Sequence, residues 1–282
     1  MRTGTSSRYA ALKACLSIFR IKTAEGFQYR LAGIAGASVG IFWALIEITV
    51  YTVFYTYSDN RLAGMPAGLD LKQVITYAWL SQIFFLMQPL GIDKEILGKI
   101  ISGDVGIELC RPLDLYFHWF SKTAASRLTP LFWRGSITLC AGLLMPASYR
   151  LSPPASPEGL LLMLVSFFSA FLLCTSYGML ICAFRLNIAW GDGPTHILML
   201  IGSVLSGSYL PLQLWPEFLQ KFLFLQPFAG YLDIPLRLYL GLLSPDSAPG
   251  AIGLQLLWSV FFILLGKCLM KARLKKIVVQ GG

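Results

Sequence analysis

One stretch of sequence decides the class of fold: residues 31–57, LAGIAGASVGIFWALIEITVYTVFYTY. Glu47 is its only ionisable residue. At about 1.5 Å per residue, a helix of this length exceeds the ~30 Å hydrocarbon core of a bilayer. We therefore expect a membrane-spanning helix.

Five further apolar runs follow the first. They lie at about Leu71–Leu90, Thr129–Ser148, Gly159–Phe184, Pro194–Leu210 and Ala248–Met270. Across 282 residues, 56% are hydrophobic and 13% are charged, whereas soluble domains are about one quarter charged. The sequence predicts an all-α membrane protein with six transmembrane helices in one domain over residues 1–282.

The distribution of positive charge predicts the orientation. The net charge is +9, and 17 Lys and Arg residues lie on the side of both termini, against five on the other side. Cytoplasmic loops carry the excess of Lys and Arg, so we expect both termini in the cytoplasm. The expected location is the plasma (inner) membrane of a bacterial cell, which the chain crosses several times. The basic residues flank apolar runs instead of lining one soluble face, which argues against a nucleic-acid partner.

Two segments outside the spans are expected to contact the membrane surface. Residues 7–29 predict a basic amphipathic helix, which either lies in the interface against the lipid bilayer or leads into the first span. Its apolar positions are Tyr9, Leu12, Leu16 and Phe19, and its basic positions are Arg8, Lys13, Arg20 and Lys22. Residues 211–247, with prolines at 211, 216, 227 and 235, predict an external re-entrant hairpin of short helices.

Residues 91–128 form the longest charged stretch and are expected to be a cytoplasmic loop. Ile92, Ile96 and Ile100 recur every four residues, and the pattern breaks at Ser102-Gly103-Asp104. This spacing predicts a short amphipathic helix between the second and third spans. We expect its isoleucine stripe to dock a soluble partner.

Catalytic motifs are weak. Gly36-Ala-Ser38-Val-Gly40 matches G-x-S-x-G, but that motif needs a strained strand-to-helix turn, and here it lies within an apolar helix where its glycines favour close helix packing. An intramembrane serine hydrolase using Ser38 with His118 or His196 is the weaker of two rival hypotheses. An ion-coupled transporter or channel centred on Glu47 is the stronger rival, because an ionisable residue inside a membrane is costly.

The sequence contains no phosphate-binding G-x-x-x-x-G-K-[ST] loop, and Ile100 follows Gly98-Lys99 where a hydroxyl would have to bind Mg²⁺. Its two histidines and six cysteines have no metal-ligand spacing. We therefore expect no catalytic residue, no metal site and no cofactor on this chain.

Two regions resemble the type-2 ATP-binding-cassette (ABC) exporter permeases. The first region is Gly91-Ile-Asp-Lys-Glu-Ile-Leu-Gly-Lys-Ile-Ile followed by Gly103-Asp-Val-Gly-Ile-Glu-Leu-Cys-Arg-Pro112. The second is Ser206-Gly-Ser-Tyr-Leu-Pro211-Leu-Gln-Leu-Trp-Pro216, followed by Leu225-Gln-Pro227-Phe and Leu238-Tyr-Leu-Gly241. With the amphipathic N-terminal helix and six spans, the resemblance covers essentially the whole chain.

The resemblance implies a permease that pairs with a second, identical or related, permease subunit. ATP and Mg²⁺ would bind separate ATP-binding subunits, which would contact a coupling element containing Asp93, Glu95, Lys99, Gly103, Asp104 and Glu108. The candidate pathway or helix-interface residues are Gly36, Gly40, Glu47, Gly202, Ser206 and Gly207, together with Ser203. The expected cargo is an amphipathic or lipid-like compound, a glycan or a peptide, moved outward.

Overall fold

The computed structural model describes residues 3–28, 30–57, 69–110, 113–186 and 192–275, with side chains from residue 13 in the first helix and from residue 31 in the second. All regular structure in these ranges is helical. The helices are α1 (Thr3–Gln28), α2 (Arg30–Tyr57), α3 (Leu71–Phe85), α4 (Lys94–Ser102), α5 (Val105–Leu109), α6 (Leu115–Leu144), α7 (Pro157–Arg185), α8 (Gly193–Leu205), α9 (Glu217–Leu225), α10 (Asp233–Tyr239) and α11 (Ala248–Leu274). Short 3₁₀ turns lie at Leu212–Leu214, Pro227–Tyr231 and Pro245–Ser247.

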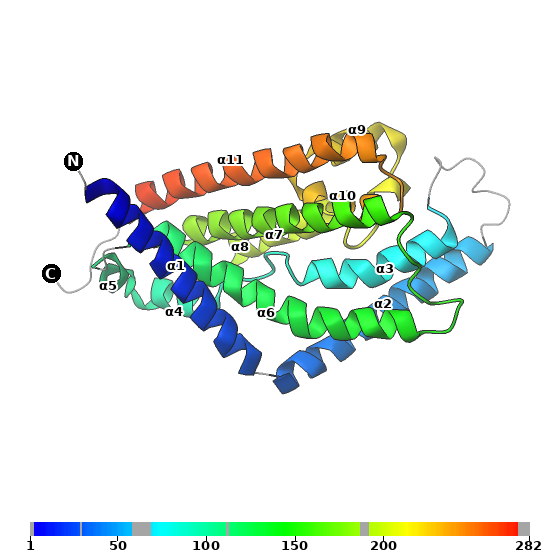
Figure 1. The fold of residues 1–282 in the computed structure, drawn as a ribbon, viewed down its shortest axis with the longest axis horizontal. Coiled ribbons are helices and arrows are strands. Elements are labelled where there is room, and N and C mark those ends of the chain that lie inside the picture. Colours follow the sequence, from blue (N-terminus) through cyan, green and yellow to red (C-terminus); the bar gives the residue numbers. More distant parts are fainter. Residues whose placement is uncertain (1–2, 29, 58–68, 111–112, 187–191, 276–282) are drawn as a thin grey trace.

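The long helices lie side by side, and the short ones gather at opposite ends of the bundle (Figure 1). The beginning of α1, the end of α11, and α4 and α5 share one end. The short helix α9 lies at the other end, where α11 begins. The predicted coupling segment and the predicted hairpin are therefore at opposite ends of the molecule.

Three helical stretches of the described chain are long and apolar enough to cross a membrane: Leu31–Tyr57, Pro157–Arg185 and Pro245–Leu274. The second predicted span, α3, has 15 residues, and the fifth, α8, has 13, so both are shorter than expected. The third predicted span is instead longer, because α6 begins at Leu115 and runs through Pro130. A count of six spans remains a prediction.

Capping residues explain where several helices begin. The Asp70 carboxylate accepts from the Gln73 backbone N–H, and the Gln73 side chain accepts in return from the Asp70 N–H, which forms a capping box at α3. The Ser156 hydroxyl accepts from the Gly159 N–H, and Pro157 occupies the first turn of α7. Asp114 caps α6 in the same way by accepting from the Phe117 N–H.

The core consists of a large central cluster, a smaller one at the α4–α5 end, and a third of Leu212, Leu223 and Ala229 at the α9 end. Trp79 of α3 is fully buried in the central cluster, where its indole N–H donates to the Tyr149 carbonyl at 2.8 Å. Gly142 lets α6 approach this ring, since a Cβ there would lie 3.0 Å from it. Buried Gln255 joins α11 to α7 by accepting from the Ser166 hydroxyl at 3.0 Å.

The helix α1 does not lie only against the bilayer surface, because its described side chains also contact α6. The Phe27 ring packs edge-on against Phe132 and Trp133, with ring centroids 5.1 and 6.1 Å apart. Among the predicted apolar positions, Leu16 is 60% exposed and Phe19 is half-buried. The side chains of Arg8, Tyr9 and Leu12 lie outside the described part of the structure.

Candidate functional site

The predicted coupling segment folds into two short helices joined by a sharp turn. The Asp93 carboxylate begins α4 by accepting from the backbone N–H groups of Glu95 and Ile96 at 3.0 and 3.3 Å. Gly103 ends α4 with a φ of +80°, a left-handed conformation that costs glycine little. This turn redirects the chain into α5.

The isoleucine stripe faces the bundle, which corrects the expectation that it docks a soluble partner. Ile96 is fully buried, and Ile92 and Ile100 pack partly buried against the same cluster. The other buried members come from α5, α6, α7 and α11 and from Leu186 just beyond α7: Val105, Leu115, Tyr116, Trp119, Met179, Cys182, Ala183, Leu186 and Met270. The stripe lies on one side of α4, and its apolar face is covered within the chain.

A single carboxylate, that of Glu95, ties α4 to two other helices. Its oxygens lie 2.7 Å from the Lys22 Nζ of α1 and 2.5 Å from the Lys122 Nζ of α6. A third lysine, Lys99, is one turn along α4 at 3.1 Å. Burial opposes ionisation of Glu95, but the three ammonium groups outweigh it and hold the pKa of this carboxyl well below its usual range.

A second carboxylate extends this network to α5. Glu108 is buried, with 3% of its surface exposed, and pairs with Lys99. The Nδ1 of His118, which is also buried, lies 3.2 Å from the other Glu108 oxygen. Burial disfavours the ionised carboxyl, yet Lys99 and the nearby positive groups lower the pKa of Glu108 overall. We call Lys22, Glu95, Lys99, Glu108, His118 and Lys122 the ion-pair network.

The opposite face of α4 and α5 is open. Gly103 and Asp104 are exposed there, and the Asp104 carboxylate accepts from the Ser102 hydroxyl at 2.6 Å. Three large apolar side chains accompany them: Ile101 at 67%, Ile107 at 66% and Leu109 at 47% exposure. Sequence reasoning missed all three. The sequence could have predicted them, because these apolar residues lie at positions of α4 and α5 outside the buried isoleucine stripe.

The structure therefore divides the predicted coupling residues. Glu95, Lys99 and Glu108 point into the ion-pair network, and Asp93 caps α4. Only Gly103 and Asp104 lie on the open face. Arg111 and Pro112, the end of the motif, lie outside the described residues.

The predicted glycines of α2 pack against α6. A Cβ on Gly36 would overlap the Arg134 guanidinium, and one on Gly40 would lie 3.6 Å from the Thr138 hydroxyl oxygen. A Cβ on Gly33, one turn earlier, would lie 2.8 Å from the Trp133 Cβ. Small residues at this spacing let two helices approach closely, as the sequence indicated.

Glu47 lies on a cavity of about 480 Å³ between α2, α3 and the segment after α8. Its Oε1 accepts from the Gln82 side-chain amide of α3 at 3.1 Å. The cavity lining is mainly apolar and aromatic, with a few polar groups: Trp43, Ile46, Glu47, Val50, Tyr51, Ser81, Gln82, Phe85, Ser208, Tyr209 and Leu210.

The segment that follows α8 reaches the same cavity through Ser208, Tyr209 and Leu210. The Gln88 amide of the α3–α4 connection donates to the hydroxyls of Ser206 and Ser208 at 3.1 and 2.5 Å. Gly207 has a φ of +88°, and its carbonyl accepts from the Tyr77 hydroxyl at 2.9 Å. Ser208, which directly follows the candidates Ser206 and Gly207, lines the same cavity as Glu47, whereas Ser206 and Gly207 do not line it.

The remaining α8 candidates make packing contacts. Gly202 faces Tyr177 and Phe228, and a Cβ there would lie 3.4 Å from the Tyr177 ring. Ser203 is buried, and its hydroxyl donates to the Met199 carbonyl at 3.2 Å. Neither residue lines the Glu47 cavity.

Ser38 lacks the setting of a nucleophile. It lies in the unbroken helix α2, and its hydroxyl donates to the Ala35 carbonyl at 2.7 Å. His118 belongs to the ion-pair network, and His196 lies in the first turn of α8. In the described ranges, no three His, Cys, Asp or Glu side chains gather closely enough to hold a metal ion.

Comparison with known proteins identifies the family. The family model described as ABC-2 family transporter protein matches residues 38–281, which is most of the chain. No curated protein and no solved structure is significantly similar to the chain. The resemblance noted in the sequence is thereby confirmed: the chain is a multi-pass membrane protein that belongs to the ABC-2 family of transporter membrane subunits.

Proposed function

We propose that the chain is the membrane-spanning permease of an ATP-driven exporter, in which α4 and α5 receive the movement of a separate ATP-binding subunit. Membership of the ABC-2 family implies such a partner, and permeases of this kind carry no ATPase motif of their own. ATP and Mg²⁺ would bind that partner. The permease itself would form the pathway and transmit the motion.

The observation that carries the proposal is the two-sided construction of α4 and α5. Their inner side is fixed to the bundle by Ile96 and by the Glu95 carboxylate, which reaches α1 and α6. Their outer side presents Ile101, Ile107 and Asp104 without a partner helix among the described residues. An exposed apolar group rimmed by polar residues is typical of a protein interaction site.

This construction suits the transfer of motion. A short helix that was loosely attached would move alone when a partner pushed it. Because Glu95 bonds to Lys22 and Lys122, a displacement of α4 would carry α1 and α6 with it as one body. The α1 helix would then act as a connecting helix at the inner membrane surface.

The 480 Å³ cavity is the proposed section of the pathway within one subunit. It joins α2 and the end of α8, the two helices that the sequence indicated. Its walls carry Trp43, Val50 and Phe85, which suits an amphipathic or lipid-like compound, and its few polar groups cluster around Glu47. A glycan or peptide cargo needs the wider pathway that two permease subunits would enclose together.

A second permease subunit has an available surface. The helix α2 exposes Phe42 and Trp43 at 62% and 53%, and α11 exposes Leu257 and Leu264 at 61% and 63%. Such surfaces face either lipid or another membrane helix. In this arrangement the six spans are α2, α3, α6, α7, α8 and α11, and the end with α4 and α5 faces the cytoplasm.

Co-purification tests the docking face. The tagged full-length chain is purified from its own cells, and bound ATP-binding subunits are identified by mass spectrometry. We expect Asp104→Lys and Ile107→Ala each to reduce the amount of co-purified subunit and the coupled ATP hydrolysis about tenfold, within the range for important interface residues.

Matched controls lie at the opposite end of the bundle. Asp246→Lys changes an exposed acid in the same way, and Leu225→Ala truncates a side chain that is 65% exposed, against 66% for Ile107. Both controls should retain the partner. If no ATP-binding subunit co-purifies with the wild type, or if the α4–α5 variants behave like the controls, the proposed function is wrong.

A further inference from the structure

Two arginines on one face of α6 form no ion pair with an acid among the described residues. Arg127 and Arg134 are seven residues apart, close to two helical turns, so their side chains leave the same side of the helix. Within the described residues, neither guanidinium forms a hydrogen bond or an ion pair. Arg127 is 93% buried, and its Nη1 has neither a solvent contact nor an acceptor.

Each guanidinium lies against a glycine of another helix. A Cβ on Gly178 of α7 would lie 3.0 Å from the Arg127 Cζ, and a Cβ on Gly36 of α2 would overlap the Arg134 guanidinium. Any larger residue at either glycine would push the arginine aside. The two helices that flank α6 therefore leave room for these charges.

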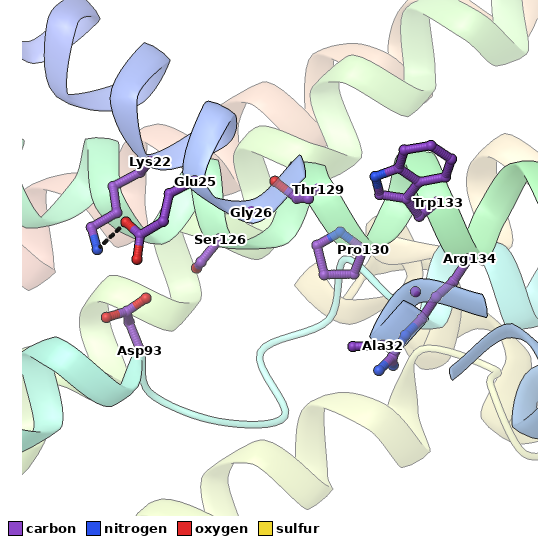
Figure 2. Close-up of a pocket in the computed structure, with 11 residues that line it drawn as sticks. Lys22, Glu25, Gly26, Ala32, Asp93, Ser126, Thr129, Pro130, Trp133 and Arg134 are labelled. Carbon is purple, nitrogen blue, oxygen red and sulfur yellow. Dashed lines mark hydrogen bonds and ion pairs between the residues drawn. The ribbon is translucent and has the colours of Figure 1, made fainter. Parts of the chain in front are cut away.

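The arginines line two adjoining cavities. One, of about 280 Å³, lies between the end of α1, the beginning of α2 and the middle of α6, and Figure 2 shows Arg134 and Asp93 on its walls. The other, of about 380 Å³, extends along the α3–α4 connection and includes Arg127. The two share four lining residues: Asp93, Ser126, Pro130 and Arg134.

The acids in these cavities make their direct contacts with groups other than the two arginines. Glu25 accepts from Lys22 at 2.9 Å, as the dashed line in Figure 2 marks, and Asp93 caps α4. Lys94 adds another positive charge to the second cavity. The charge of Asp93 acts on Arg127 without forming an ion pair, and one carboxylate cannot balance Arg127, Arg134 and Lys94. Because a buried charge without a paired counter-charge is costly, the two guanidinium groups facing one space call for a further anion.

We propose that these cavities bind the phosphate group of a membrane phospholipid, held by Arg127 and Arg134. Guanidinium groups pair with phosphate oxygens through two parallel hydrogen bonds, so phosphate suits the pair better than a single-point anion. The lipid source follows from the surroundings. Leu31 and Phe132 neighbour the lining residues Ala32 and Trp133 and are 82% and 56% exposed, so acyl chains have an apolar surface beside the headgroup.

Lipid binding tests this site in the absence of an ATP-binding subunit. The result is therefore independent of the co-purification experiment that tests the proposed function. The full-length chain in neutral detergent is titrated with dioleoyl-phosphatidylglycerol, and bound lipids are counted by native mass spectrometry. Dioleoylglycerol, which has the same acyl chains and no phosphate, is titrated in parallel. A third titration uses inorganic phosphate.

We expect the phospholipid to bind at least about tenfold more tightly than dioleoylglycerol, the factor of one charge-assisted hydrogen bond. Arg127→Gln and Arg134→Gln should each remove this difference, whereas Arg150→Gln, an exposed arginine outside both cavities, should keep it. Since Arg134 is only half-buried, its variant preserves the test if Arg127→Gln fails to fold.

Equal binding of the two lipids, or unchanged phospholipid binding in Arg134→Gln, would overturn the proposal. Inorganic phosphate that displaces the phospholipid at equal concentration would overturn the lipid assignment and identify a site for free phosphate. Phosphate that fails to compete supports the lipid.

Discussion

The Lys22 Nζ lies 2.7 Å from the Glu95 Oε2, which joins the N-terminal helix α1 to the coupling helix α4 across 73 positions of sequence. Both side chains are partly exposed, so solvent weakens the attraction. The geometric consequence is larger than the energetic one. A movement of α4 has a direct connection to the helix that lies along α6.

Replacement of Lys22 by Met separates these two consequences. We expect Lys22→Met to lower the free energy of unfolding by less than about 1 kcal/mol, the usual range for a partly exposed ion pair. Coupled ATP hydrolysis should fall more clearly, because α1 would no longer follow α4. Thermal unfolding and the ATPase rate of the complex measure the two effects, and Lys13→Met, an exposed lysine of the same helix, is the control. An unchanged ATPase rate would contradict the connection.

The ion-pair network also predicts a pH dependence. The pKa of Glu95 is lowered from its ordinary value of 4.5, so its contribution to stability is complete above that value and is lost as pH falls below it. The pKa of Lys99 is raised from 10.5, so its contribution persists up to that pH. The difference in melting temperature between the wild type and Glu95→Gln should therefore be constant from pH 6 to 9 and shrink towards pH 3.5. A difference that stays constant down to pH 3.5 would show that Glu95 is not held ionised.

Two isoleucines of α4 distinguish its inner and outer faces. Ile96→Ala should lower the free energy of unfolding by about 2–4 kcal/mol, because Ile96 is fully buried and its truncation opens a cavity in the cluster that it shares with Trp119. Ile101→Ala, 67% exposed, should change it by less than about 0.5 kcal/mol. Chemical denaturation in detergent measures both. Equal losses would mean that α4 does not pack as described.

Local patterns allowed much of this fold to be predicted. The 31–57 run predicted α2 because apolar composition and length are local properties, and the break at Ser102-Gly103-Asp104 marked the end of α4. The spacing of Ile92, Ile96 and Ile100 likewise predicted an amphipathic helix. Its direction could not be predicted, since a stripe buried against the same chain and one that docks a partner have the same period.

Other features depend on contacts between distant residues. The first half of α6 was predicted as loop because Lys122 and Arg127 made it too polar for lipid, but Glu95 and a cavity accommodate those charges within the folded chain. The convergence of Glu47 with Ser208 on one cavity likewise requires α2, α3 and the end of α8 to be placed together. Neither relationship has a local signal.

Gly207 is a position where only glycine fits. Its φ of +88° is strained for other residues, and a Cβ would lie 2.6 Å from the Tyr77 hydroxyl oxygen that donates to the Gly207 carbonyl. We expect Gly207→Ala to lower the free energy of unfolding by roughly 1–3 kcal/mol. Gly253→Ala, in α11 with open space around it, should have no such cost. Equal melting temperatures for the two variants would contradict the close contact with Tyr77.

Glu47 distinguishes an ATP-driven pathway from an ion-coupled one. In the wild type the Gln82 amide donates to the Glu47 carboxylate at 3.1 Å. The side-chain oxygen of the Glu47→Gln variant can accept the same hydrogen bond, so the cavity should keep its shape. If ATP hydrolysis drives export, the rate of transport into the lumen of inside-out vesicles should change by less than about twofold, which corresponds to about 0.4 kcal/mol. An ion-coupled transporter would instead lose transport driven by a proton gradient, because a glutamine cannot carry the proton. The measurement compares wild type and Glu47→Gln with ATP alone and with a proton gradient alone. Transport by the wild type that needs the gradient and disappears in the variant would replace the exporter with the ion-coupled alternative.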